Sequence, residues 1–153
     1  GDGRAHPPVP LTMNLILEHY SNLNLVVPHD VAQNPRDNFK PQGLWVSVKG
    51  EDDWPSWCAR EDFGCGAICH RVELKPTARV LILSTPECLD IFDRMYGDGQ
   101  QMIRWQEVAA EHAGLIITPY QWSRRFSHLW YYGWDCASGC IWDASAIQSI
   151  TRT

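Results

Sequence analysis

The sequence of 153 residues lacks the apolar run of about 20 residues that a membrane-spanning helix needs. It also shows no basic leader followed by an apolar stretch, so we expect no signal peptide and a cytoplasmic protein, with secretion left open. Its apolar share of 44% is ordinary for a folded domain, which argues against a disordered chain.

Several well-known catalytic and nucleotide-binding motifs are also missing. No GxGxxG and no GxxxxGK[ST] occurs in the sequence, so a dinucleotide-binding Rossmann domain and a P-loop enzyme are disfavoured. The absence of HExxH removes the commonest zinc hydrolase, and the absence of GxSxG removes the usual serine esterase.

Lysine is scarce, and the charge balance is acidic. Only three of the 13 basic residues are lysine and the net charge is −5, which argues against a general grip on a phosphate backbone. A local basic patch in "WSRRFSH" (122–128) keeps nucleic acid open as a partner, although the overall charge does not indicate it. We expect no membrane partner.

Cysteine is present in an even number, with two pairs spaced as "CGAIC" and "CASGC". Together with His70, this spacing admits a zinc site at Cys65, Cys69, Cys136 and Cys140. A chain of this length and apolar content needs neither metal nor disulfides to fold. We therefore favour reduced cysteines that act as small buried apolar residues, and we expect no metal.

Eight tryptophans are many for a chain of this length. Their flat rings can stack a base, a sugar or a nicotinamide. The aromatic content alone motivates one hypothesis, a tryptophan-rich domain for carbohydrate binding or protein interaction.

The pattern of apolar residues predicts one α+β domain over residues 11–153, after a flexible tail over residues 1–10. Runs of strands with a few short helices occur, and there is no internal repeat. The expected strands cover 15–21, 43–49, 69–75, 79–84, 115–120, 128–134 and 140–143, and the expected helices cover 51–62, 85–97 and 100–114.

The order of four pieces resembles the ADP-ribosyltransferase superfamily, which uses NAD and includes poly-ADP-ribose polymerases and bacterial toxins. "EHYS" (18–21) ends a first strand, and "GLWVS" (43–47) is a second strand that runs into a helix with "WPSWC". "HRVELKPTARVLIL" (70–83) is a segment of paired strands, and "CIWDASAI" (140–147) looks like the last strand of that superfamily.

This resemblance implies a compact split antiparallel β-sheet core with a few short helices, and a site for NAD. It implies that His19 takes the place of the first-motif histidine. From the same motifs we expect NAD contacts from Ser21, Gly43, Trp45 and Ser47, while Tyr20 is interpreted as a polar edge residue of the strand.

The last motif departs from the superfamily. A catalytic Glu is usual five residues before the closing Asp, and here Ser138 lies five residues before Asp143. A positively charged sugar that forms as nicotinamide leaves is stabilised by a carboxylate, so we expect another acid to replace that Glu. Asp135 is the first candidate and Glu107 the second, while Asp143 is interpreted as structural.

Two functions follow from the resemblance. The first is an enzyme that cleaves the nicotinamide–ribose bond of NAD and transfers ADP-ribose to an unknown acceptor. The second is a catalytically silent module that binds NAD or ADP-ribose, motivated by Ser138 at the position of the usual acid.

Overall fold

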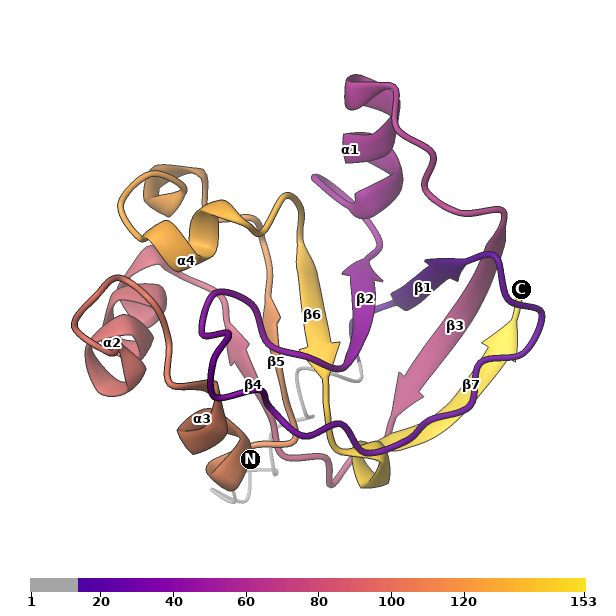
Figure 1. The fold of residues 1–153 in the computed structure, drawn as a ribbon. Coiled ribbons are helices and arrows are strands. Elements are labelled where there is room, and N and C mark those ends of the chain that lie inside the picture. Colours follow the sequence, from indigo (N-terminus) through magenta and orange to yellow (C-terminus); the bar gives the residue numbers. More distant parts are fainter. Residues whose placement is uncertain (1–13) are drawn as a thin grey trace, which may run out of the picture.

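The computed structural model describes residues 14–153, and the tail predicted over residues 1–10 lies outside them. The described chain forms one curled sheet of seven strands with a few short helices, which confirms the α+β class (Figure 1). The strands lie in the order β4-β5-β6-β2-β1-β3-β7. Their bounds are β1 (Leu17–Ser21), β2 (Leu44–Val48), β3 (Ile68–Leu74), β4 (Val80–Leu83), β5 (Gly114–Ile117), β6 (Ser138–Ile141) and β7 (Ile147–Arg152).

The helices are α1 (Trp54–Glu61), α2 (Pro86–Tyr96), α3 (Trp105–Glu111) and α4 (Leu129–Tyr132). The second begins where the sequence predicted, after Thr85, whereas the first begins three residues later than expected. The Asp53 side chain accepts the backbone N–H of Ser56 before α1, and Thr85 accepts that of Cys88 before α2. No helix within residues 14–153 is both long enough and apolar enough to cross a membrane.

One pair of strands departs from an antiparallel sheet. β4 and β5 are parallel, from the pairing of Val80 with Gly114 to that of Leu83 with Ile117. The chain between them contains α2 and α3, because a parallel connection needs a long crossover. The other strand pairs of the described chain are antiparallel.

Two local predictions were wrong. The stretch 128–134 was expected as a strand, but it contains the short helix α4. Trp130 and Tyr131 are both fully buried, and a strand would turn two consecutive side chains to opposite faces. The chain also ends in a strand that was not expected, β7, which pairs with β3 along the edge of the sheet.

The sheet opens between β1 and β2. These strands pair only at Leu17 with Val48 and at Glu18 with Ser47, whereas β1 and β3 pair over the whole of β1. Beyond Glu18, β1 runs away from β2 at a wide angle (Figure 1). The side chain of His19 bridges the opening, with its Nδ1 atom 2.6 Å from the carbonyl oxygen of Trp45.

Two apolar clusters hold the sheet from its two faces. The first packs α2, α3 and α4 against β4, β5 and β6, and it is rich in aromatic rings such as Phe92, Trp105 and Trp130. The second joins the two parts of the curled sheet, with Leu17 and Val72 on one side and Val46, Ile116 and Ile141 on the other. The opening between β1 and β2 therefore lies between two well-packed regions.

Candidate functional site

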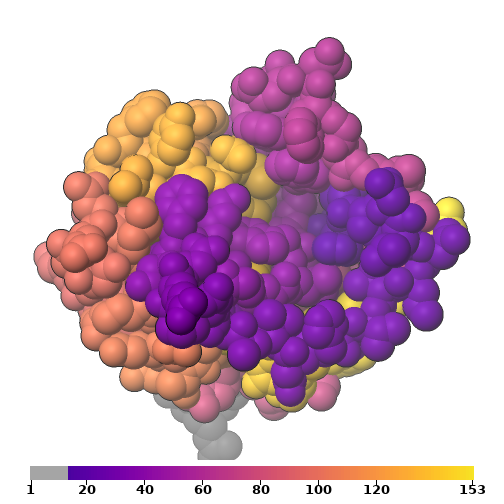
Figure 2. Space-filling view, in the orientation of Figure 1, coloured from indigo at the N-terminus to yellow at the C-terminus, as the bar shows by residue number. Residues whose placement is uncertain are grey.

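A cavity of about 290 Å³ lies where β1 separates from β2, a size at the lower end for small-ligand pockets. Figure 2 shows this face hollowed between the lobe that carries α1, the segment before β2, and β1. The residues around the cavity come from β1, β2, the loop before β2, α1 and its following loop, and the start of β6. They are Glu18, His19, Tyr20, Lys40, Trp45, Val46, Ser47, Trp54, Cys65, Cys136 and Ser138.

Three polar residues form a row across the floor of this cavity. Glu18 pairs with Ser47 between β1 and β2, and Ser47 pairs with Ser138 between β2 and β6. Directly paired residues of antiparallel strands project to the same face, with Cα atoms about 4.5–5.5 Å apart. A ligand in the cavity therefore meets one carboxylate and two hydroxyls in a line.

The two hydroxyls have different free capacities for hydrogen bonds. The backbone N–H of Trp54 donates to Oγ of Ser47 at 2.9 Å, so the hydroxyl hydrogen of Ser47 remains available to a ligand. Ser138 donates its own hydroxyl hydrogen to the carbonyl of Cys136, also at 2.9 Å. Ser47 is therefore suited to donate to a ligand, and Ser138 to accept from one.

Aromatic rings form two walls of the cavity. Trp45 is half-buried and held edge-on by Trp134, with ring centroids 4.8 Å apart. On the other side, Trp54 stacks on Trp57 at 5.1 Å and donates its Nε1–H to the carbonyl of Cys65. Such fixed rings offer a flat apolar surface to a planar ligand.

His19 is held in one orientation at the opening of the sheet. Because a carbonyl oxygen only accepts, the contact with Trp45 requires that Nδ1 carries the hydrogen. In the neutral imidazole, Nε2 is then the acceptor. His19 can thus receive a hydrogen bond from a ligand hydroxyl while its other nitrogen fixes the path of β2.

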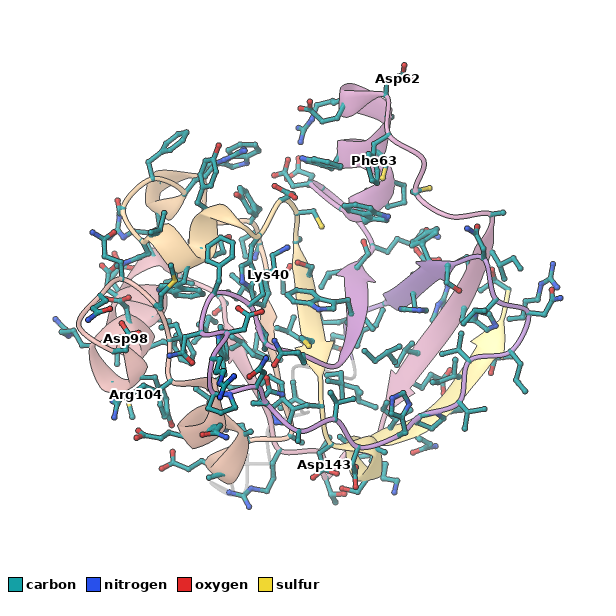
Figure 3. The ribbon with its side chains drawn as sticks, in the orientation of Figure 1. Lys40, Asp62, Phe63, Asp98, Arg104 and Asp143 are labelled. Carbon is teal, nitrogen blue, oxygen red and sulfur yellow. The ribbon has the colours of Figure 1, made fainter. Side chains whose placement is uncertain are left out.

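A lysine lies at the edge of the cavity. The Nζ atom of Lys40 lies 5.4 Å from the centre of the Trp45 ring, within cation–π range (Figure 3). Among the described residues, it is the one lysine or arginine that lines the cavity. An anionic group of a ligand would find its complement here.

Two thiols and one phenol at or near the cavity have raised pKa values. Burial raises the pKa of the Cys136 thiol to about 12, and burial also raises the pKa values of Tyr20 and Cys69. A protonated thiol is a poor nucleophile, so neither Cys136 nor Cys69 is poised for nucleophilic attack at neutral pH.

The structure brings together four of the residues expected from sequence: His19, Trp45, Ser47 and Ser138 all line the cavity. Tyr20, interpreted above as an edge residue, also lines it. Ser21, which was expected there, instead accepts the backbone N–H of Leu23 at the end of β1.

Gly43 is beside the cavity wall rather than in its lining. A Cβ atom at this position would lie 2.6 Å from the carbonyl oxygen of Ile141. The glycine therefore serves the close approach of β2 to β6.

The two acids proposed from sequence do not line the cavity. Asp135 is half-buried in the loop between α4 and β6, next to the lining residue Cys136. Glu107 is exposed on α3 and forms an ion pair with Arg104 at 2.6 Å. Its partner Arg104 does not line the cavity either, so the structure gives Glu107 no contact with this site.

Asp143 has the structural role that was expected of it. It lies two residues after β6, and its carboxylate accepts from the backbone N–H and the hydroxyl of Ser145. It therefore caps the short 3₁₀ turn that leads to β7.

Sequence reasoning missed Glu18, the one carboxylate of the described chain that lines the cavity. Its signal was the alternation of β1, since Glu18 shares a face with Tyr20 and lies next to His19 in "LEHYS". Lys40 and Cys65 were missed as well, because each comes from a loop that is brought to the cavity only by the fold.

All six cysteines are free thiols, and within residues 14–153 no three His, Cys, Asp or Glu side chains are arranged to hold a metal ion. Four of the eight tryptophans are buried core residues, namely Trp105, Trp130, Trp134 and Trp142. No family model, no curated protein and no solved structure was found to match this chain.

Proposed function

We propose that this chain is an NAD-dependent ADP-ribosyltransferase, which cleaves the nicotinamide–ribose bond and transfers ADP-ribose to an acceptor. One observation carries the proposal. The cavity lies at the opening between β1 and β2 and collects the residues that the motif resemblance implies, namely His19, Trp45, Ser47 and Ser138. These residues belong to β1, β2 and β6, three strands that are distant from one another in the sequence, and the fold brings them to one site.

Each of these side chains suits one part of NAD. The ring of Trp45 packs against the planar nicotinamide, and the hydroxyl hydrogen of Ser47 bonds the carboxamide oxygen. Nε2 of His19 accepts from a ribose hydroxyl. Lys40 attracts the diphosphate from the edge of the cavity.

The chemistry requires little beyond positioning and charge. The nicotinamide ring of NAD is already cationic, so it leaves as a neutral molecule, and the ribose carbon that it leaves gains positive charge. Fixed dipoles and a nearby carboxylate stabilise that charge. The acceptor then attacks the same carbon from within the cavity.

Nicotinamide release tests the proposal directly. The protein is incubated with NAD, and free nicotinamide and ADP-ribose are separated by chromatography, with heat-denatured protein as the control. Release that depends on folded protein and follows its concentration is the expected result. The assay is run with water as the only acceptor and again with added peptides or oligonucleotides. If no nicotinamide is released under either condition, an enzymatic function is contradicted.

A silent NAD-binding module is the second candidate, favoured by Ser138 at the position where the superfamily has its acid. A ligand that binds only the folded state raises the melting temperature by mass action. A rise in melting temperature with NAD but no nicotinamide release would therefore favour this second function. If NAD neither raises the melting temperature nor releases nicotinamide, both candidate functions are contradicted.

A further inference from the structure

The cavity contains a carboxylate that the motif resemblance does not assign. Glu18 on β1 lines the cavity and is only 8% exposed. An acidic side chain is rarely buried without a purpose, because removing its charge from water is costly unless partners compensate. Its partners therefore show what holds it there.

Three side chains surround this carboxylate, one from β1 itself and two from the neighbouring strand β3. The hydroxyl of Tyr20 donates to Oε1 at 3.3 Å, and the thiol of Cys69 donates to Oε2 at 3.3 Å. The guanidinium of Arg71 lies 4.0 Å from Oε2 and supplies a positive charge. Because burial raises the pKa values of Tyr20 and Cys69, both remain donors at neutral pH.

The position of Glu18 in the sheet relates it to the missing acid. It belongs to the same transverse row as Ser47 and Ser138, two strands from Ser138 and on the same face. Two strand spacings amount to about 10 Å, and a ribose ring that lies over Ser47 would bridge that distance. A glutamate on the first strand can then face the same sugar from the opposite end of the row.

We infer that Glu18 is the catalytic carboxylate of this site, so that the acid has moved from the last strand to the first. The inference rests on the function proposed above. Asp135 and Glu107 do not line the cavity, whereas Glu18 does, and Tyr20 and Cys69 hold its carboxylate in place. The charge of Glu18 stabilises the ribose carbon as nicotinamide leaves.

The reaction balances with water as the simplest acceptor. The bond between the ribose C1′ atom and the nicotinamide nitrogen breaks, and its electron pair returns to that nitrogen. A lone pair of the water oxygen forms the new bond to C1′. The proton lost by the water passes to the Glu18 carboxylate and then to solvent, so NAD and water give ADP-ribose, nicotinamide and one proton.

Glu18→Gln tests the inference, because it keeps the size of the side chain and one of its two acceptor oxygens but removes the charge. We expect the turnover number at saturating NAD to fall about a hundredfold or more, while the rise in melting temperature with NAD is retained. Glu107→Gln is the matched control, since it removes the same charge from α3, and it is expected to stay within about twofold of the wild type.

The outcomes separate this inference from the function on which it rests. If the wild type releases nicotinamide and Glu18→Gln does so at the same rate, Glu18 is not the acid, and the proposed function stands. A large loss in Asp135→Asn without one in Glu18→Gln would transfer the role to Asp135. If the wild type releases nothing, the proposed function and this inference both fail.

A second variant guards against a loss of folding. If Glu18→Gln melts far below the wild type, Glu18→Asp keeps the charge beside Arg71 and withdraws the carboxylate by one methylene. A turnover number reduced about tenfold or more, with the NAD-dependent rise in melting temperature unchanged, supports the inference. Turnover at the wild-type rate in this folded variant overturns it.

Discussion

At the scale of single residues, a few side chains shape the cavity at the opening between β1 and β2. His19 is central because one ring nitrogen bonds the carbonyl of Trp45 and the other is left for a ligand. Trp45 in turn is held by Trp134 and approached by Lys40. Replacement of His19 therefore removes a support of β2 and, under the proposed function, an acceptor for a ribose hydroxyl.

We expect His19→Ala to reduce the NAD-dependent rise in melting temperature by half or more, because it removes an acceptor for a ribose hydroxyl and a support of the cavity wall. Differential scanning fluorimetry over a range of NAD concentrations measures this. His29→Ala is the control, since His29 is exposed and contacts only the carbonyl of Val27 two residues away. An unchanged rise in His19→Ala would remove His19 from the site.

At the scale of elements, the start of α1 sets the second aromatic wall. Asp53 precedes this helix and accepts from the backbone N–H groups of Gly50 and Ser56 as well as the hydroxyl of Ser56. Trp54 follows directly and lines the cavity. The N-cap residue of α1 and a residue that lines the cavity are thus adjacent in the sequence.

Asp53→Ala should destabilise the protein by about 1 kcal/mol, the usual cost of an N-cap. It should also weaken NAD binding, because the first turn of α1 positions the ring of Trp54. Urea unfolding and the NAD-dependent melting shift measure the two effects. Glu61→Ala, at the exposed last position of α1, should change neither, and an equal loss there would contradict the role of the cap.

A second element-scale contact joins α2 to the loop before α4. Asp90 on α2 receives two hydrogen bonds from the guanidinium of Arg124 and one contact at 2.9 Å from His128. These bonds, with that of Arg124 first, lower the pKa of Asp90 to about 2. The carboxylate therefore stabilises the folded state in its charged form.

The sign of the pH dependence follows from that shift. The pKa of Asp90 is about 2 in the folded protein against an ordinary value of 3.8, so its stabilisation is present above pH 3.8 and is lost as the pH falls towards 2. Asp90→Asn should lower the melting temperature by a few degrees at pH 6, and the difference should vanish near pH 2. Glu61→Gln, which removes an exposed carboxylate at the end of α1, is the control. If the difference in melting temperature between Asp90→Asn and the wild type is as large at pH 2 as at pH 6, the effect comes from side-chain packing rather than from charge.

At the scale of the whole molecule, thiols and phenols with raised pKa values occur in several elements of the fold. Burial raises the pKa of Cys58 in α1 to about 11, of Tyr96 in α2 to about 12 and of Cys136 before β6 to about 12. Their ordinary values are 9.0 for the thiols and 10.0 for the phenol. Each of these groups is therefore neutral in the folded protein at neutral pH.

These groups predict a loss of stability in alkali. A pKa that is raised on folding stabilises the protein fully below the unfolded value and ceases to do so as the pH rises through the folded value, here from 9 to 12. Urea unfolding should show a lower free energy of unfolding at about pH 10.5 than at about pH 7.5. Cys136→Ala should make this decline shallower, and equal stability of the wild type at both values would contradict the assignment.

Local sequence signals determined much of this protein. The capping residue Thr85 located the start of α2, the acids and Pro55 located that of α1 to within three residues, and β-type patterns located β1 through β6 to within a few residues. The short motifs around His19 and Trp45 indicated two strands that line one cavity. These features depend on neighbours in the chain, and the sequence displays such neighbours directly.

Only the tertiary structure decided which acid lies in the cavity. The register of β1 against β2 brings Glu18 into line with Ser47 and Ser138, and no local pattern reveals the register between strands that are distant in the sequence. The helix α4 also depends on tertiary packing, because the same buried cluster contains both Trp130 and Tyr131. The strand β7 forms because it pairs with the edge of β3. Long-range packing outweighed the local preference in each case, because burial against distant residues provides more free energy than local propensity does.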